Sequence, residues 1–398
     1  MSLAHGRHYL AIPGPSVMPD RVLQAMHRPA PNIYYGALAE MTDAMIPDLK
    51  RVACTEGHVA IYIANGHGVW EASLANVAAP GEAMLALCTG RFGFGWAETA
   101  ARMGIAVERM DFGLQAPVDP ARLQERLRAD TDHAIRVITM VQVDTATSVR
   151  SDVAAVRRAI DAAGHPALLM VDCIASLGVD EMRMDDWGAD VVITASQKGL
   201  MTPPGLGFVF FSDRARSRRA EMANVSMYWD WVPRSEPEMF YQYFNGTAPT
   251  HHLYGLREAL NMLHEEGMEN VWARHAILAR TVWAAVEAWG KGGPLAFNIA
   301  DPALRSHAVT TLAIGKDHGP RLRRWLTEEA GVTLGIGLGM ETVEKRDSDG
   351  YFRIAHMGHV NAHMVLGVLG TIEAGMTALG IPHGKGALEA AAAVCARV

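Results

Sequence analysis

Two ionisable residues each close a short apolar run that predicts a buried strand. Lys198 comes just after VVITA, and Asp172 ends PALLMVD, 26 residues earlier in the chain. Because the carboxyl ends of parallel strands meet at one edge of a sheet, we expect both side chains to lie there together. Burial makes a lysine amine nucleophilic, as a Schiff-base lysine requires, and a carboxylate can keep a pyridine nitrogen protonated. The pair therefore predicts Lys198 and Asp172 as catalytic residues around a cofactor that reacts with amines.

Each of these residues alone also fits a structural role. A lysine at a strand end can extend its ammonium group to solvent, and an aspartate there can cap the following helix. The spacing of the two residues favours the cofactor interpretation over both alternatives.

Two further motifs suggest anion binding. Asn65, Gly66 and His67 lie between an apolar strand and a helix, where backbone N–H groups and the helix dipole favour a phosphate; an ordinary strand–helix turn is the alternative. Arg353 lies in GYFRIAHMG, a predicted strand, and its planar guanidinium group suits a carboxylate. The alternative for Arg353 is an internal salt bridge.

The strands that would position these residues alternate with helices. Short, nearly continuous apolar runs at 58–64, 83–88, 134–143, 166–172, 190–195 and 207–211 predict a mainly parallel sheet covered on both faces. The pattern is lost over 226–250, which is rich in aromatic residues and is expected to form a long ordered excursion. Two long helices follow, and a second α/β region covers the rest. We expect an N-terminal arm at 1–20, a large domain at 21–270 and a small domain at 271–398.

Composition excludes several classes of function. A net charge of −7 leaves no basic surface for nucleic acid or for an anionic membrane. The four cysteines are scattered, without metal-ligand spacing, and the N-terminus lacks a signal-peptide core. These features predict a cytoplasmic protein without a metal site.

Several segments in chain order resemble the class V, fold-type I aminotransferases, within them the serine–glyoxylate and alanine–glyoxylate group. The similarity is carried by PGPSVMPDRVL, ANGHGVWEA, VDCIASLG, SQKGLMTPPGLG and FRIAHMGHVN. It implies a large α/β domain with a mainly parallel seven-stranded sheet, a smaller C-terminal α/β domain, and pyridoxal 5'-phosphate joined to Lys198.

The same resemblance implies roles for the remaining candidates. Asn65, Gly66, His67 and Gln197 would hold the cofactor phosphate, although many relatives have Ser in place of Asn65. Phe92 would stack on the cofactor ring, Thr145 would donate to its ring oxygen, and Arg353 would bind the substrate carboxylate. Thr247 would reach the phosphate of the neighbouring subunit, so a homodimer with shared active sites is expected. Phe244 replaces the usual tyrosine near this contact.

The expected activity is transamination between serine or alanine and glyoxylate or pyruvate. A pyridoxamine–pyruvate aminotransferase is the first alternative, because segments at 31–38, 227–244 and 337–350 depart from the expected pattern. A lyase such as a cysteine desulfurase is disfavoured, because no cysteine lies between residues 290 and 390. A non-catalytic cofactor-binding protein is disfavoured because Lys198 and Arg353 are both present.

Overall fold

The predicted strands between residues 58 and 211 form one sheet in the computed structural model, which describes residues 2–342 and 347–397. In the described chain this sheet is seven-stranded, in the order β2-β8-β7-β6-β5-β3-β4. Strands β7, β6, β5, β3 and β4 are mutually parallel, and β8 runs antiparallel to both β7 and β2. The bounds are β2 His58–Ala64, β3 Ala83–Cys88, β4 Ala106–Asp111, β5 Ile135–Val141, β6 Leu168–Asp172, β7 Val191–Ala195 and β8 Gly205–Phe211. The mainly parallel seven-stranded sheet is confirmed.

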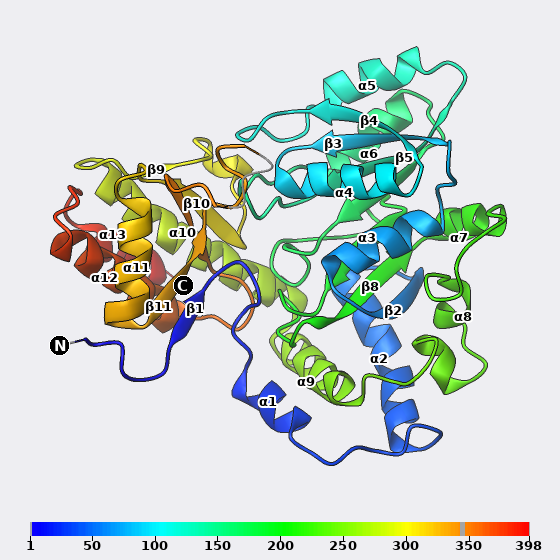
Figure 1. Ribbon diagram of the computed structural model, residues 1–398, viewed down its shortest axis with the longest axis horizontal. Helices are drawn as coiled ribbons and strands as arrows, with labels where there is room; N and C mark the ends of the chain where they lie inside the picture. The colour runs from blue at the N-terminus through cyan, green and yellow to red at the C-terminus, as the bar shows by residue number, and fades with distance from the viewer. Residues whose placement is uncertain (1, 343–346, 398) are drawn as a thin grey trace.

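Helices cover both faces of this sheet because its central strands are apolar on both sides. In β6, Leu169 and Val171 pack into one hydrophobic cluster, while Leu168 and Met170 pack into another. The first cluster includes residues of α2 (Ala37–Ala53), α5 (Pro120–Ala129), α6 (Val153–Ala162) and α9 (Thr250–Glu266). The second includes residues of α3 (Gly66–Ala75) and α4 (Arg91–Arg102), which lie in front of the sheet in Figure 1.

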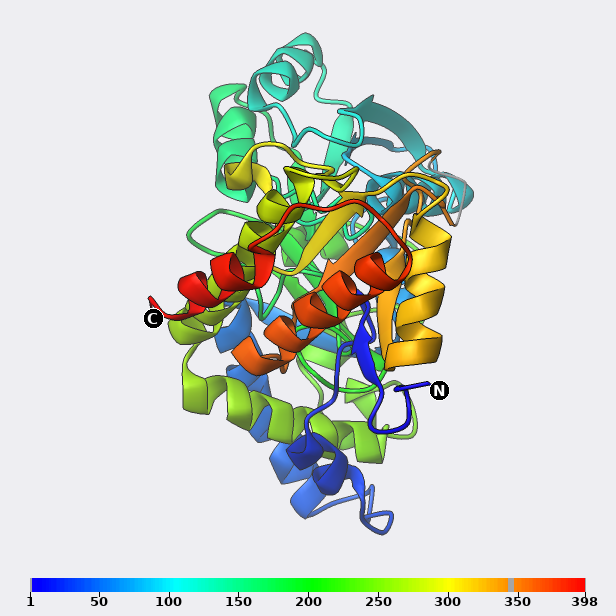
Figure 2. The ribbon, with the colours of Figure 1, turned by 90° about the vertical axis from the view of Figure 1, so that its left-hand side faces the viewer.

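A second sheet, five-stranded in the described residues, has the order β1-β11-β12-β10-β9. Its strands are β1 Tyr9–Ala11, β9 Ala296–Phe297, β10 Val309–Ala313, β11 Val332–Ile336 and β12 Tyr351–Ala355. It packs with α10 (Met268–Gly290), α11 (Gly319–Ala330), α12 (Ala362–Ala378) and α13 (Ala387–Cys395), which Figure 2 shows from their side. Strand β1 pairs in parallel with β11, so part of the expected N-terminal arm belongs to the small sheet.

The sequence analysis did not foresee β4. This strand lies at the edge of the large sheet, and most of its residues are exposed or half-buried. The apolar run that marks the central strands is therefore missing from it. Residues 343–346 of the segment at 337–350 lie outside the described residues. In the described chain, no helix combines the length and the apolar content that a membrane span requires.

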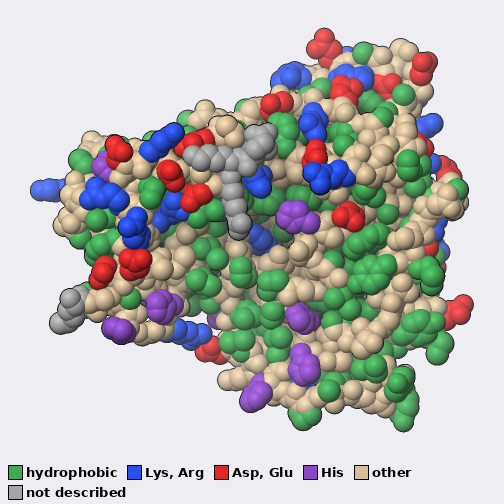
Figure 3. All heavy atoms as spheres, viewed as in Figure 1, with side chains coloured by type: hydrophobic (Ala, Val, Ile, Leu, Met, Phe, Trp, Pro, Cys, Tyr) green, Lys and Arg blue, Asp and Glu red, His purple; other side chains and the backbone are tan. Residues whose placement is uncertain are grey.

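Apolar and charged side chains are unevenly distributed over the surface. In the view of Figure 3, apolar side chains gather at the lower right, over the region where Figure 1 labels α2, α3 and α8 (Val232–Ser235). The strongly exposed aromatic and apolar residues include Tyr34, Tyr35 and Met227, which are 82%, 75% and 79% exposed.

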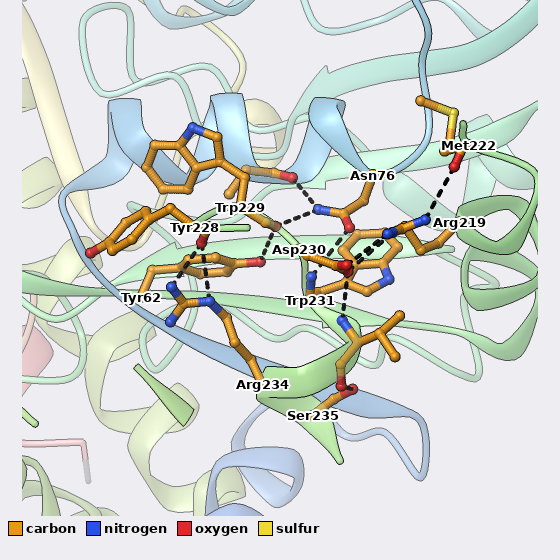
Figure 4. Close-up of polar contacts among 12 residues, drawn as sticks. Tyr62, Asn76, Arg219, Met222, Tyr228, Trp229, Asp230, Trp231, Arg234 and Ser235 are labelled. Carbon is orange, nitrogen blue, oxygen red and sulfur yellow. Dashed lines mark hydrogen bonds and ion pairs between the residues drawn. The ribbon is translucent and has the colours of Figure 1, made fainter. Parts of the chain in front are cut away.

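The segment at 226–250 is ordered around one buried arginine, Arg234, whose hydrogen bonds to the Tyr228 carbonyl are drawn in Figure 4. The Arg234 guanidinium group is fully buried and donates to the carbonyl oxygens of Tyr228, Ile61 and Tyr243 at 2.7, 2.8 and 2.9 Å. It also lies over the rings of Tyr62 and Tyr228, at 4.4 and 4.9 Å from their centres. Because Ile61 belongs to the edge strand β2, this arginine ties the segment to the large sheet.

Further contacts attach the same segment to helix α3 and to β8. The Trp229 carbonyl accepts from Asn76 and from the Tyr62 hydroxyl at 2.7 and 2.9 Å (Figure 4). Trp231 stacks on Phe211 with ring centres 4.2 Å apart. The predicted ordered excursion is therefore a packed layer over the edge of the sheet, in which α8 and the 3₁₀ turn Phe240–Tyr243 are the helical pieces.

Replacing this arginine should weaken the protein clearly. Arg234→Met removes the donors of three buried carbonyl groups, so we expect a loss of about 3 kcal/mol in the free energy of unfolding. The measurement is urea unfolding followed by far-ultraviolet circular dichroism. Arg216→Met is the matched control, since Arg216 is 44% exposed and pairs with Glu236; it should cost less than about 1 kcal/mol. Equal losses in the two variants would contradict the anchoring role.

Candidate active site

A cavity of about 290 Å³ opens where the carboxyl ends of β5, β6 and β7 meet. Its volume is close to the lower limit for pockets that hold a cofactor-sized ligand. Most of the predicted site residues line it: Asn65, Gly66, His67, Phe92, Thr145, Asp172, Gln197 and Lys198. Other lining residues were not predicted, and they include Gly14, Pro15, Trp70, Ile174 and Pro204. The sheet edge thus brings together residues from widely separated parts of the chain.

The Lys198 amine lies against the N-terminal arm. It donates a hydrogen bond to the Pro13 carbonyl oxygen, and a Cβ atom at Gly14 would overlap the amine. Burial lowers the pKa of Lys198 from 10.5 to about 7; the charge of Arg353 adds to this effect, and Asp172 opposes it. A large share of this amine is therefore neutral, and nucleophilic, at neutral pH.

Asp172 is 2% exposed and is held by one donor on each carboxylate oxygen. Oδ1 accepts the backbone N–H of Ile174 and Oδ2 accepts the indole N–H of Trp70, both at 2.8 Å. Burial raises the pKa of Asp172 to about 6, while these two hydrogen bonds act in the opposite direction. At neutral pH the side chain is mostly a fixed carboxylate.

The predicted phosphate site lies at the start of helix α3. Asn65 is the N-cap of this helix, and its side-chain oxygen accepts the backbone N–H groups of His67 and Gly68 at 3.1 and 3.2 Å. A Cβ atom at Gly66 would lie 2.6 Å from the Ile174 side chain, so glycine is needed for close packing here. In the described structure the Gln197 side-chain oxygen is buried without a hydrogen-bond partner, which fits a polar ligand beside it.

Asp144 joins the loop that carries Thr145 to the helix that carries Phe92. One of its oxygens accepts the backbone N–H of Phe92 at 2.8 Å, and the other accepts that of Ala146 at 2.9 Å. A Cβ atom at Gly90 would lie 2.5 Å from the Asp144 carboxyl carbon. Burial raises the pKa of Asp144 against these N–H donors. Asp144 therefore holds the Thr145 loop against the start of helix α4.

Arg353 lies on β12 beside the site, although it does not line the cavity. Its Nε donates to the Ile336 carbonyl at 2.7 Å and its Nη1 to the Thr145 carbonyl at 2.8 Å. Burial lowers its pKa to about 10, so it stays charged at neutral pH. In the part of the chain that the structure describes, both of these bonds go to backbone carbonyls and not to a carboxylate, so they do not support the alternative of an internal salt bridge.

Thr247, like Arg353, does not line this cavity. It is exposed at the end of the ordered segment, whereas Phe244 is buried against Phe240 and Tyr243. The exposed position of Thr247 is compatible with its predicted contact with a neighbouring subunit. The residues that sequence reasoning missed are held by contacts far apart in the chain, although Gly14, Pro15 and Trp70 lie in segments that carried the family resemblance.

Comparisons with known proteins identify the family of this chain. Residues 93–362 match the family described as aminotransferase class-V. The serine–glyoxylate aminotransferase of Methylorubrum extorquens is 36% identical over 97% of this chain and 95% of its own length. The L-aspartate–glyoxylate aminotransferase of Paracoccus denitrificans is 34% identical over 96% and 94%.

A solved structure of similar fold is the ureidoglycine–glyoxylate aminotransferase of Bacillus subtilis. It has a TM-score of 0.87 and 24% identity and covers 99% of both chains. The pyridoxamine–pyruvate aminotransferase of Mesorhizobium loti has a TM-score of 0.86 and 24% identity, over 99% of this chain and 98% of its own. The fold is therefore that of the fold-type I aminotransferases.

The chain belongs to the class V aminotransferases, of the serine–glyoxylate and alanine–glyoxylate group. It is a transaminase acting on small amino acids and oxo acids, and the family implies pyridoxal phosphate as cofactor.

The environment of Lys198 predicts an unusual pH dependence. Because its pKa is lowered to about 7, the fraction of neutral amine should rise with pH and level off just above that value. The rate of reductive methylation of Lys198 in the cofactor-free protein follows this neutral fraction, and mass spectrometry of the Lys198 peptide measures the rate at each pH. A rate that still rises steeply above pH 9, as for an ordinary lysine whose pKa is about 10.4, would contradict the assignment.

Proposed function

We propose that this chain transfers an amino group from serine or alanine to glyoxylate or pyruvate, with pyridoxal phosphate joined to Lys198. The observation that carries the proposal is the cavity shared by a buried lysine amine with a lowered pKa and a buried carboxylate. The names of the more similar relatives, which are serine–glyoxylate and L-aspartate–glyoxylate aminotransferases, support these substrates.

The residues present fit this cofactor. Asp172 would pair with the ring nitrogen and Phe92 would stack on the ring, with Thr145 beside the ring oxygen. Gln197, with its unpartnered buried oxygen, would hold the phosphate together with the α3 N-terminal residues Asn65, Gly66 and His67. When bound, pyridoxal phosphate supplies an aldehyde that joins to amines and a ring that takes up electrons from the substrate Cα–H bond.

The protein's own groups divide the work between them. The Lys198 amine would act as the base that removes the proton from the substrate Cα atom and as the acid that later returns a proton. The Pro13 carbonyl, which accepts from this amine in the structure, holds it near the cavity. Arg353 has two donors fixed by backbone carbonyls and would offer the rest of its guanidinium group to the substrate carboxylate.

The alternatives are less well supported. The pyridoxamine–pyruvate aminotransferase is similar at 24% identity, which speaks for the fold alone, whereas the glyoxylate-dependent relatives reach 36%. A desulfurase needs a cysteine at the site, and none of the residues that line the described cavity is a cysteine.

All four thiols are free, which supports the expected cytoplasmic location.

We also propose that the protein acts as a homodimer with shared active sites. Exposed aromatic and apolar residues on the ordered segment and near it support an interface: Tyr34, Tyr35, Ile63, Met227, Val232, Met239 and Tyr241. Monomers rarely expose large apolar patches, and Figure 3 shows apolar side chains gathered in this region. Thr247 lies exposed at the end of the same segment and would approach the phosphate of the partner subunit.

The activity is tested by a screen of amino donors and acceptors. Serine or alanine with glyoxylate or pyruvate should give turnover, because the pocket is small and Arg353 lies beside it, where it could bind a carboxylate. Parallel lines in double-reciprocal plots are expected, since the first product leaves before the second substrate binds. Turnover of pyridoxamine with pyruvate, without turnover of serine or alanine, would overturn the assignment.

Shared sites are tested by mixing two inactive variants. Lys198→Ala and Thr247→Ala subunits, combined in one dimer, should leave one complete site if Thr247 serves the partner. Cofactor content, measured by absorbance, should then show one tightly bound equivalent per mixed dimer, while Lys198→Ala homodimers form no borohydride-stable adduct. If Thr247 acts within its own subunit, every site in the mixture carries a defect and no wild-type site appears.

A further inference from the structure

Trp70 has no assigned role in the function described so far, yet it contacts the side chain that would face the cofactor ring nitrogen. It lies on α3, about one helical turn after the N-cap, and is 2% exposed. Its indole N–H donates to Asp172 Oδ2 at 2.8 Å. The other oxygen of Asp172 is oriented by the Ile174 backbone, so Trp70 is the side chain that fixes the second oxygen.

The Trp70 ring is itself held on several sides. It meets the His67 ring edge-on with centres 4.6 Å apart and the Phe92 ring edge-on at 6.3 Å, and it stacks near Trp96 at 6.3 Å. His67 and Phe92 also line the cavity. Trp70 therefore connects the residues expected at the phosphate, at the ring face and at the ring nitrogen, and its indole N–H has a fixed direction.

The hydrogen bond changes the basicity of Asp172. A donor to a carboxylate stabilises its charged form, and the effect is large where water is excluded. The charged and titratable groups that act on Asp172 include Asp144, which raises its pKa, and Lys198, which lowers it; Cys173 follows it in the chain. Because Lys198 changes its bonding during the reaction, Trp70 provides a constant contribution in the same direction.

We propose that Trp70 is a positioning residue that keeps Asp172 ionised and aligned, and so keeps the ring nitrogen of the cofactor protonated. The proposal rests on the proposed function, because it concerns pyridoxal phosphate in this cavity. Without the indole N–H, the carboxylate becomes more basic, and the proton shared by the pair moves from the ring nitrogen toward Asp172.

The chain contains a matched control for this contact. Trp96 is buried beside Trp70 at an interplanar angle of 14°, and in the described structure its indole N–H has no hydrogen-bond partner. Trp70→Phe and Trp96→Phe therefore make the same chemical change in neighbouring buried rings. A loss of packing affects both variants, whereas the loss of a hydrogen bond to Asp172 affects only Trp70→Phe.

The test uses holoenzyme loaded with cofactor labelled with ¹⁵N at the ring nitrogen. In Trp70→Phe the ¹⁵N resonance should move toward the position of neutral pyridine, and kcat should fall about tenfold with little change in KM, as expected for a bond to a charged group. In Trp96→Phe the resonance should stay at the wild-type position. An unchanged resonance in Trp70→Phe, or an equal shift in both variants, would overturn the proposal.

A second measurement covers the case in which Trp70→Phe does not fold. Wild-type protein and the Asp172→Asn variant are both prepared with ¹⁵N-labelled tryptophan. The Trp70 indole signal should differ between the two proteins, while the Trp96 signal should not. A Trp70 signal that is the same in both proteins refutes the contact. The proposed function fails separately: wild-type protein that takes up no pyridoxal phosphate refutes it, whereas uptake with an unchanged ring-nitrogen resonance in Trp70→Phe refutes only the role of Trp70.

Discussion

The exclusion of water from the edge of the large sheet is the constraint on which the site depends. Lys198 and Asp172 lie there because Asp172 is the last residue of the apolar strand β6 and Lys198 follows the end of the apolar strand β7. The same burial lowers the pKa of the amine and raises that of the acid, to about 7 and about 6. Both groups are thus brought near the pH at which proton transfer is efficient.

Hydrogen-bond donors from the backbone and from an aromatic side chain oppose the effect of this burial on the pKa values of the acids. Asp172 and Asp144 are both buried acids, and each accepts hydrogen bonds from groups that cannot lose their protons at neutral pH. Two of these donors, Trp70 and Phe92, lie on helices α3 and α4, which also carry residues expected at the phosphate and at the ring face. The cavity is therefore one connected set of contacts, in which the framework that shapes the pocket also tunes its charges.

The sequence predicted the parts of this arrangement that depend on local pattern. The central strands are marked by continuous apolar runs, and Lys198, Asp172 and Asn65 follow or flank those runs, so their shared edge could be inferred. The expectation for Phe92 came from the family resemblance. Strand β4 was missed because its residues are largely exposed. The contacts of Trp70 with Asp172 and of Pro13 with Lys198 join segments 102 and 185 residues apart, and no local pattern encodes such pairings.

The N-terminal strand has a consequence for any engineered form of this enzyme. Residues 9–11 pair with β11, and two residues later the chain reaches Pro13, whose carbonyl accepts a hydrogen bond from the Lys198 amine. Gly14 packs closely beside the same amine. The N-terminal arm therefore connects the second sheet to the Lys198 amine. Removing the first dozen residues, or adding a bulky N-terminal tag that displaces them, would therefore alter the surroundings of the proposed catalytic lysine, although these residues lie far from it in the sequence.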